Sequence, residues 1–352
     1  MLFLALYTRR FERPVSCVVK GPSGSGKSFA LESALKFVPA DTYQYFAGMS
    51  EKAIVYSGMD LRHKHLVIGE AAGLASGDGR AFLRQLLSEG TVRYMTVQKT
   101  DKGLTGKELP TVQGPCGLIM TTTANSLHPE DESRMLSLNI RESTDQIRAA
   151  LLAQALGSRP NQGPDFTRWH EFDRLIGSGS VSVAIPFAAS IARALPLTHH
   201  RVQRDFPQVL SLISSHALMH KCIRQKNESG EIVATLEDYE EVYDLVNGPL
   251  SEGLELAVPV HIRELVEAVS TMVNSTGDYD PFTNGVTQST LAEVLKKDQS
   301  SVSRSVQKSI ELGYLKNQNP GQGRDASIIL GERRLPHGYA LPCPKDLNQL
   351  VP

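Results

Sequence analysis

Gly21-Pro22-Ser23-Gly24-Ser25-Gly26-Lys27-Ser28 is the stretch that decides the fold of this chain. It fits the phosphate-loop pattern G-x-x-x-x-G-K-[ST] at every fixed position. The β-branched run at 14–20 predicts a buried strand before it, and 29–36 predicts a helix after it. Glycines let backbone N–H groups surround phosphate oxygens at a helix N-terminus. The stretch therefore predicts a nucleotide site, and the alternative is a chance glycine-serine loop.

The last two residues of the motif predict the cofactors. Lys27 can reach the β- and γ-phosphates of ATP, and the Ser28 hydroxyl can ligate Mg²⁺. We therefore expect ATP and Mg²⁺ at this loop.

The length and composition of the chain limit the classes of protein to which it can belong. The 352 residues suffice for two or three domains. Lys and Arg total 37 against 38 Asp and Glu, so contacts with nucleic acid must come from local basic patches. The four cysteines lie far apart with no zinc-ligand spacing, which predicts reduced thiols in a cytoplasmic protein. No apolar run reaches transmembrane length, and we expect no membrane partner.

Residues 1–145 predict an α/β core. The apolar strand at 65–70 ends in Glu70, where a carboxylate can polarise the water that attacks the γ-phosphate. Gly69 stands where an ATPase usually has an aspartate. Either Ser28 holds the magnesium alone or Glu70 serves both roles through water. The alternative is that Glu70 is only a surface carboxylate.

A strand at 91–97 and a return strand at 108–112 predict a hairpin. Its tip carries Lys99, Lys102 and Lys107. Two interpretations stay open for these lysines, a solvated loop or a finger that grips phosphates.

The strand at 117–120 ends in hydroxyl and amide side chains, 121–125, that can lie between Glu70 and the γ-phosphate. Arg134 follows shortly after, at the position of an arginine finger in ring-forming ATPases. A local ion pair of Arg134 with Glu130 or Glu132 is the alternative.

Residues 146–254 predict a helical lid. Arg201 and Arg204, before an apolar helix, are candidates for a second γ-phosphate sensor. His216 and His220 have the i,i+4 spacing of a metal site. The sequence shows no third ligand for them, which favours core or polar-face histidines.

Residues 255–336 predict a winged helix-turn-helix: three helices, 262–273, 287–295 and 301–312, followed by a two-stranded wing. Ser303, Arg304 and Lys308 on the third helix and Arg324 in the wing suit phosphates and base edges of DNA. The alternative is a winged helix used for protein contacts. Residues 337–352 predict an irregular tail.

With these residues in place, the chain resembles AAA+ helicases of the minichromosome-maintenance-like kind carried by mobile elements and phage. It is similar to the ATPase half of bacterial primase-helicase proteins. The stretches that carry the resemblance include GPSGSGKS, LVIGEAAG, LLSEGTVRYMTVQKT, GPCGLIMTTT, LHPEDESRMLSL and VQRDFPQVLSLISSHALMH. The resemblance implies a phosphate-loop AAA+ core of three layers, a helical lid and a C-terminal winged helix.

The resemblance also implies residue roles. Glu70 would activate water, Thr122 or Thr123 would sense the γ-phosphate, Arg134 would act in the neighbouring copy, and Arg204 would be a lid sensor. Lys99, Lys102 and Lys107 would touch DNA in the pore of a ring. The implied partners are single-stranded DNA in that pore, duplex at the winged helix, further copies in a hexamer, and a separate primase or initiator protein.

These expectations converge on an ATP-driven DNA translocase or helicase in replication of a mobile or phage-like element. One alternative is a DNA-binding AAA+ switch, a loader, initiator or regulator that assembles with ATP without unwinding. A non-catalytic scaffold, suggested by Gly69, and an antiviral or toxin-linked ATPase also stay open.

Overall fold

The structure is a computed structural model. It describes residues 1–50, 52–70, 78–101, 103–124, 127–140, 143–156, 164–196, 201–256, 258–275, 285–319, 326–335 and 340–347. The chain forms two compact units. The first comprises 1–194, 203–250 and 342–352, and the second comprises 195–202 and 251–341. The boundaries expected from the sequence at 145, 254 and 336 stay predictions.

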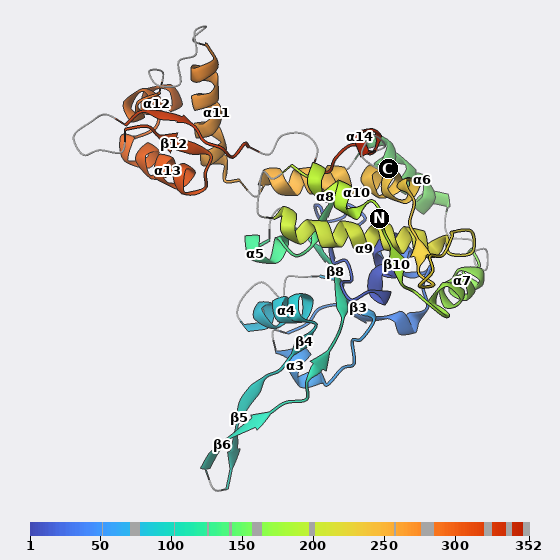
Figure 1. The fold of residues 1–352 in the computed structure, drawn as a ribbon. Helices are drawn as coiled ribbons and strands as arrows, with labels where there is room; N and C mark the ends of the chain where they lie inside the picture. Colours follow the sequence, from blue (N-terminus) through green and yellow to red (C-terminus); the bar gives the residue numbers. More distant parts are fainter. Residues whose placement is uncertain are drawn as a thin grey trace. The chain divides into compact units, whose positions relative to one another are not determined.

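A parallel sheet organises the first unit (Figure 1). Its strand order is β2-β3-β8-β1-β9, so the strand before the phosphate loop lies inside the sheet. All four pairings are parallel, which confirms the α/β class predicted for this part of the chain. The strands are β1 (Cys17–Lys20), β2 (Tyr43–Phe46), β3 (Lys64–Ile68), β8 (Cys116–Thr122) and β9 (Leu136–Asn139).

Helices pack on this sheet through apolar side chains. The helices α3 (Ala53–Ser57) and α4 (Asp78–Glu89) place Ile54 and Leu86 against Leu66, Leu118 and the rest of one core cluster. The helix α1 (Leu2–Tyr7) contacts α2 (Lys27–Leu35). The buried strands β1 and β8 are apolar almost throughout, as strands covered on both faces are.

The predicted hairpin is present between α4 and β8. Its strands are β5 (Met95–Thr100) and β6 (Gly103–Glu108), and a short pair, β4 (Thr91–Val92) and β7 (Val112–Gln113), forms its base. Figure 1 shows the β5–β6 hairpin projecting away from the parallel sheet. The segment between β8 and β9 contains a short helix, α5 (Pro129–Glu132).

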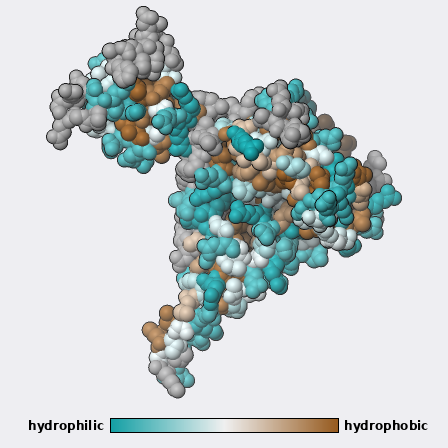
Figure 2. All heavy atoms as spheres, in the orientation of Figure 1, coloured by the Kyte–Doolittle hydropathy of each residue, from teal (hydrophilic) through white to brown (hydrophobic). Residues whose placement is uncertain are grey.

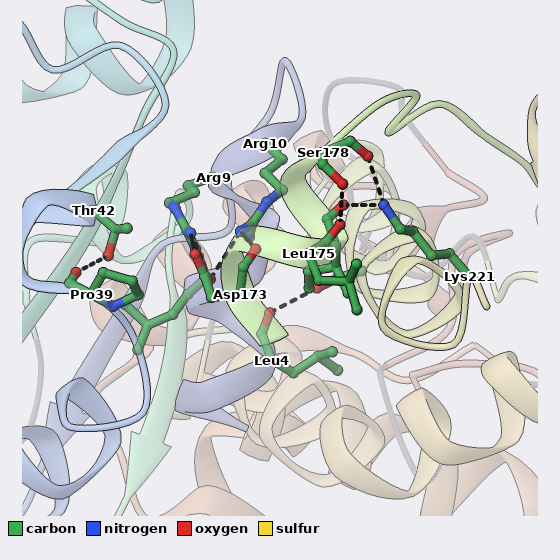
Figure 3. Close-up of polar contacts among 12 residues, drawn as sticks. Leu4, Arg9, Arg10, Pro39, Thr42, Asp173, Leu175, Ser178 and Lys221 are labelled. Atoms are coloured by element: carbon green, nitrogen blue, oxygen red, sulfur yellow. Dashed lines mark hydrogen bonds and ion pairs between the residues drawn. The ribbon is translucent and has the colours of Figure 1, made fainter. Parts of the chain in front are cut away.

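A buried ion pair joins the segment directly after α1 to the helices between residues 144 and 256 (Figure 3). Both Arg9 Nη2 contacts to the Asp173 carboxylate are 2.7 Å, and Arg10 Nη2 lies 2.9 Å from the same group. Asp173 belongs to α7, so the N-terminal segment and α7 pack as one body. The helices of this region are α6 (Thr144–Leu156), α7 (Thr167–Gly177), α8 (Ala188–Ala194), α9 (Val202–Met219) and α10 (Leu236–Leu256). Within the predicted irregular tail, α14 (Pro344–Leu347) is a short helix.

The second unit has its own core around three helices and a hairpin. Thr287 accepts a hydrogen bond from the Thr290 amide and caps its helix. Asp298 caps the next helix in the same way. Gly313, at φ 81°, follows that helix as a glycine terminator. The elements are α11 (Val260–Ser275), α12 (Gln288–Leu295), α13 (Gln299–Glu311), β12 (Leu315–Asn317) and β13 (Ile328–Leu330).

None of the helices in the described ranges combines the length and the hydropathy that a membrane span requires.

Candidate nucleotide site and basic surfaces

The phosphate loop connects β1 to α2, as the motif predicts. Gly24 and Gly26 have φ values of 84° and 87°, a region that side chains with a Cβ rarely adopt. Gly26 caps α2, so the loop presents backbone N–H groups at the N-terminus of a nine-residue helix. Such an arrangement is suited to an anion.

Lys27 is held against the carbonyls of its own loop. Its Nζ donates to Gly21 O at 2.9 Å and to Pro22 O at 2.6 Å, and the residue is only 8% exposed. The Ser25 hydroxyl is buried and finds no hydrogen-bond partner within the described part of the chain. Ser28 is exposed. These side chains fit a triphosphate with Mg²⁺ at this loop: the confined cation of Lys27, the unsatisfied hydroxyl of Ser25 and the accessible hydroxyl of Ser28.

Glu70 lies two residues after the end of β3, at the same edge of the sheet as the loop, and is exposed. The structure gives a physical reason for Gly69. A Cβ there would lie 2.7 Å from Tyr45 Oη and 3.3 Å from Ala47 O. A side chain at position 69 therefore requires the half-exposed Tyr45 side chain to move its hydroxyl, and Glu70 is the carboxylate that this edge provides.

The threonines at the end of β8 lie between β3 and β1. Thr122 is paired in register with Lys20, the last residue before the phosphate loop, and its Oγ1 accepts from the Ala124 amide at 3.1 Å. Thr123 is exposed, and Asn125 lies outside the described residues. Thr121, which belongs to the set of side chains at 121–125 but carries no predicted sensor role, donates its hydroxyl to the Gly69 carbonyl and so links β8 to the segment that carries Glu70.

Arg134 lies at the opposite edge of the sheet. It precedes β9, which is parallel to β1, and so stands near the amino ends of the strands. Its Nη2 lies 3.5 Å from Glu130 Oε1 and its Nε donates to Ser88 Oγ at 3.0 Å, so the local ion pair with Glu130 is present. Glu132 instead forms a buried ion pair with Lys20.

Arg204 joins Arg134 and is not at the phosphate loop. Its Nη1 donates to Ser133 Oγ at 2.5 Å. Burial lowers the pKa of Arg134, and the positive charge of Arg204 lowers it further. Both arginines and Arg13 line a cavity of about 510 Å³, which also touches Gly114–Cys116 at the start of β8. The lining also includes the carboxylates of Glu12 and Glu89, so the cavity combines three arginines with two acids.

One face of the hairpin carries the apolar side chains Met95, Val97 and Leu104 together with Lys99 and Glu108, and Lys107 lies on the other face. Directly opposed residues share a face, so Lys107 lies with Thr96 and Lys99 lies with Leu104. Met95, Val97 and Leu104 are each at least two-thirds exposed, and Figure 2 shows apolar atoms gathered near this end of the molecule. Lys99 and Lys107 are exposed, and Lys102 lies outside the described residues.

In the second unit, α13 presents Ser303, Arg304 and Lys308 to solvent, opposite the buried Val302 and Val306. Lys308 pairs with Glu311 at 3.1 Å. Arg324 falls outside the described residues. Arg333, a cation that follows the wing, donates to Leu312 O and lies 4.9 Å from the Tyr314 ring centroid.

Comparisons with known proteins leave the family open. No family model matches the chain, and no curated protein matches it. Among solved structures, the chain is similar to the Aeropyrum pernix ORC1 protein in complex with DNA, at 14% identity and a TM-score of 0.29, over 94% of this chain and 87% of that one. At this TM-score the likeness carries no argument. The conclusions below rest on the residues and the geometry of the chain itself.

Proposed function

We propose that this chain is an ATP-hydrolysing motor of the AAA+ type that acts on DNA as a ring of identical copies. The observation that carries the proposal is the placement of two sets of side chains at opposite edges of one sheet. The phosphate loop, Thr122 and Glu70 lie at the carboxyl edge, whereas Arg134 and Arg204 lie at the amino edge.

The carboxyl edge supplies the chemistry of nucleotide binding. Loop amides and Lys27 would hold the phosphates, and we assign the contact with the γ-phosphate to Thr122. Mg²⁺ at Ser28 would neutralise charge on the β- and γ-phosphates. Glu70 orients and polarises the attacking water. Because residue 69 is a glycine, there is no acid directly before Glu70, and Ser28 would be the direct protein ligand of Mg²⁺.

The arginines complete the site of a neighbouring copy. A strand rises about 3.3 Å per residue, so a four-residue strand separates the two edges by more than the reach of one side chain. A second copy whose phosphate loop faces the cavity would bring its γ-phosphate to Arg134 and Arg204. The two guanidiniums would then stabilise the charge of the transition state. This assignment changes the role of Arg204 from a sensor of its own nucleotide to a residue that acts between copies.

The hairpin and the second unit are the proposed DNA contacts. Lys99 and Lys107 are exposed cations on a projection, as a finger that follows a phosphate backbone requires. We interpret the second unit as a winged helix whose α13 contacts duplex. We expect hexamers, single-stranded DNA inside the ring, and a primase or initiator as a separate chain. Replication of a mobile or phage-like element is the process that the sequence resemblance suggests.

An ATPase assay on the full chain tests this function. ATP turnover is measured with and without single-stranded DNA for the wild type and for Glu70→Gln. We expect DNA to stimulate the wild type, and the variant to bind ATP and assemble without turnover. A wild type that binds ATP but never hydrolyses it, with or without DNA, would favour the scaffold.

An ATP-dependent DNA-binding switch is the second candidate. The apolar face of the hairpin favours it, because Met95, Val97 and Leu104 suit contact with protein better than sliding along phosphates. Replacing Lys99 and Lys107 by alanine separates the two. A motor loses unwinding and keeps basal ATP turnover, whereas a switch keeps both its assembly and its DNA binding at the second unit.

A further inference from the structure

Two histidines and a carboxylate meet where α9 ends and α10 begins. His216 is in the last turn of α9, His220 follows four residues later, and their ring centroids are 4.5 Å apart. Asp238, in the first turn of α10, is fully buried. One ligand atom from each of the three residues lies within 4.8 Å of the others. The fold thus brings a carboxylate to the two histidines, which the sequence pattern did not show.

Hydrogen bonds fix the protonated nitrogen of both rings. His216 Nδ1 lies 2.7 Å from Asp238 Oδ1, and His220 Nδ1 lies 2.9 Å from the backbone oxygen of His216. The Asp238 carboxylate also accepts hydrogen bonds from Arg224 Nη2 and from the Thr235 amide. A carboxylate that accepts these bonds and a carbonyl oxygen are both acceptors, so each Nδ1 donates. In the neutral rings, both Nε2 atoms then carry free lone pairs.

The surroundings hold this arrangement in place. The other Asp238 oxygen accepts from the Thr235 amide at 2.7 Å, and Arg224 Nη2 lies 2.7 Å from Oδ1. Lys221, next to His220, donates to Ile176 O at 3.0 Å and Ser178 O at 2.7 Å, which ties this end of α9 to α7 (Figure 3). The carboxylate is occupied by hydrogen bonds, so it can orient an imidazole but has little capacity left to ligate a cation itself.

We propose that His216 and His220 bind a divalent transition metal through their Nε2 atoms, with Asp238 as the carboxylate that positions His216. Metal-binding histidines characteristically donate the other ring N–H to a carboxylate or a backbone carbonyl, and both partners are present here. Imidazole pairs select Zn²⁺, Cu²⁺ or Ni²⁺ over Mg²⁺ and Ca²⁺, which take oxygen ligands. Two protein ligands leave coordination positions open for water or a ligand from another molecule. The site is separate from the phosphate loop and independent of the proposed ATPase.

A calorimetric titration of the full chain with ZnCl₂ tests the proposal. The variants are His216→Gln and His220→Gln, and His261→Gln serves as a control because His261 is an exposed histidine outside the cluster. We expect one Zn²⁺ per wild-type chain and per control chain, no saturation of this site by MgCl₂, and loss of Zn²⁺ binding in both variants. Asp238→Asn should weaken Zn²⁺ binding by about 10- to 100-fold, as loss of an orienting partner does.

Spectroscopy of the wild type keeps the test decisive if a variant misfolds. The electron paramagnetic resonance spectrum of one bound Cu²⁺ should show coupling to two imidazole nitrogens. Absence of Zn²⁺ binding to the wild type, a Cu²⁺ spectrum without imidazole nitrogen, or Zn²⁺ binding that persists in both folded histidine variants would overturn the proposal.

Discussion

Lys27 and Arg134 lie at opposite edges of the same parallel sheet. Lys27 follows the carboxyl end of β1 by way of the phosphate loop, and Arg134 comes just before the amino end of β9, the neighbour of β1. One copy of the chain cannot place both side chains on one phosphate. This relationship is the reason for proposing that nucleotide is shared between copies.

Arg134→Ala should abolish turnover without abolishing ATP binding. Loss of an arginine that acts between copies costs about 10³- to 10⁵-fold in rate. Turnover is measured at saturating ATP, and binding with a fluorescent ATP analogue. Arg84→Ala is the control, because Arg84 pairs with Glu130 and Asp131 nearby without lining the cavity. Equal loss of turnover in both variants would mean that the segment is merely destabilised.

Replacing the hairpin lysines should make DNA binding less sensitive to salt. Each phosphate contact to single-stranded DNA contributes about 0.7 to the slope of log K against log salt, so Lys99→Ala with Lys107→Ala should reduce the slope by about 1.4. Fluorescence anisotropy at several salt concentrations measures this slope. Lys226→Ala, an exposed lysine elsewhere in the first unit, should leave it unchanged. An unaltered slope in the double variant would remove the hairpin from the DNA contacts.

Gly69→Ala should destabilise the fold through overpacking. The added methyl group meets Tyr45 Oη at 2.7 Å, and such clashes cost about 1–3 kcal/mol. Because Tyr45→Phe removes the oxygen that clashes, the double variant should recover part of the loss in free energy of unfolding, measured in urea. If the two effects simply add, the explanation offered for the missing aspartate fails.

The free energy of unfolding should fall as the pH is lowered from 6.5 to 4. His65 is fully buried in β3, and burial lowers its pKa from an ordinary 6.5 to about 4. In this window the unfolded chain binds the proton and the folded chain does not, so acid favours unfolding by up to about 1.4 kcal/mol per pH unit. His65→Gln should flatten the slope between these pH values, whereas the exposed His128→Gln should not.

Much of the fold could be predicted from local sequence patterns. The phosphate loop, the hairpin and the cap at Thr287 follow from glycine, alternation and capping rules that act within a few residues. Long-range arrangements did not follow from such rules. The position of Arg204 beside Arg134 depends on how α9 packs, and Asp238 reaches His216 across 22 residues.

The departure at Gly69 shows the same limit. From the sequence it is only a missing acid, and the reason lies in Tyr45 on the adjacent strand. Likewise, the ion pair of Lys20 with Glu132 gives no signal in the sequence, since two charged residues in different segments have no pattern that pairs them.

A mixing experiment tests the sharing of the site between copies most directly. The Glu70→Gln and Arg134→Ala variants are each expected to lack DNA-stimulated ATP turnover. The two variants are then mixed and allowed to reassemble. In a mixed assembly, the phosphate loop and Glu70 of an Arg134→Ala copy can lie next to Arg134 of a Glu70→Gln copy. ATP turnover should return at such a site, because every group in it is intact. Mixing Glu70→Gln with Lys27→Ala is the control, because every phosphate-loop site then carries a defect. The account predicts recovery in the first mixture and none in the second; no recovery in the first, with mixed assemblies demonstrably formed, would contradict it.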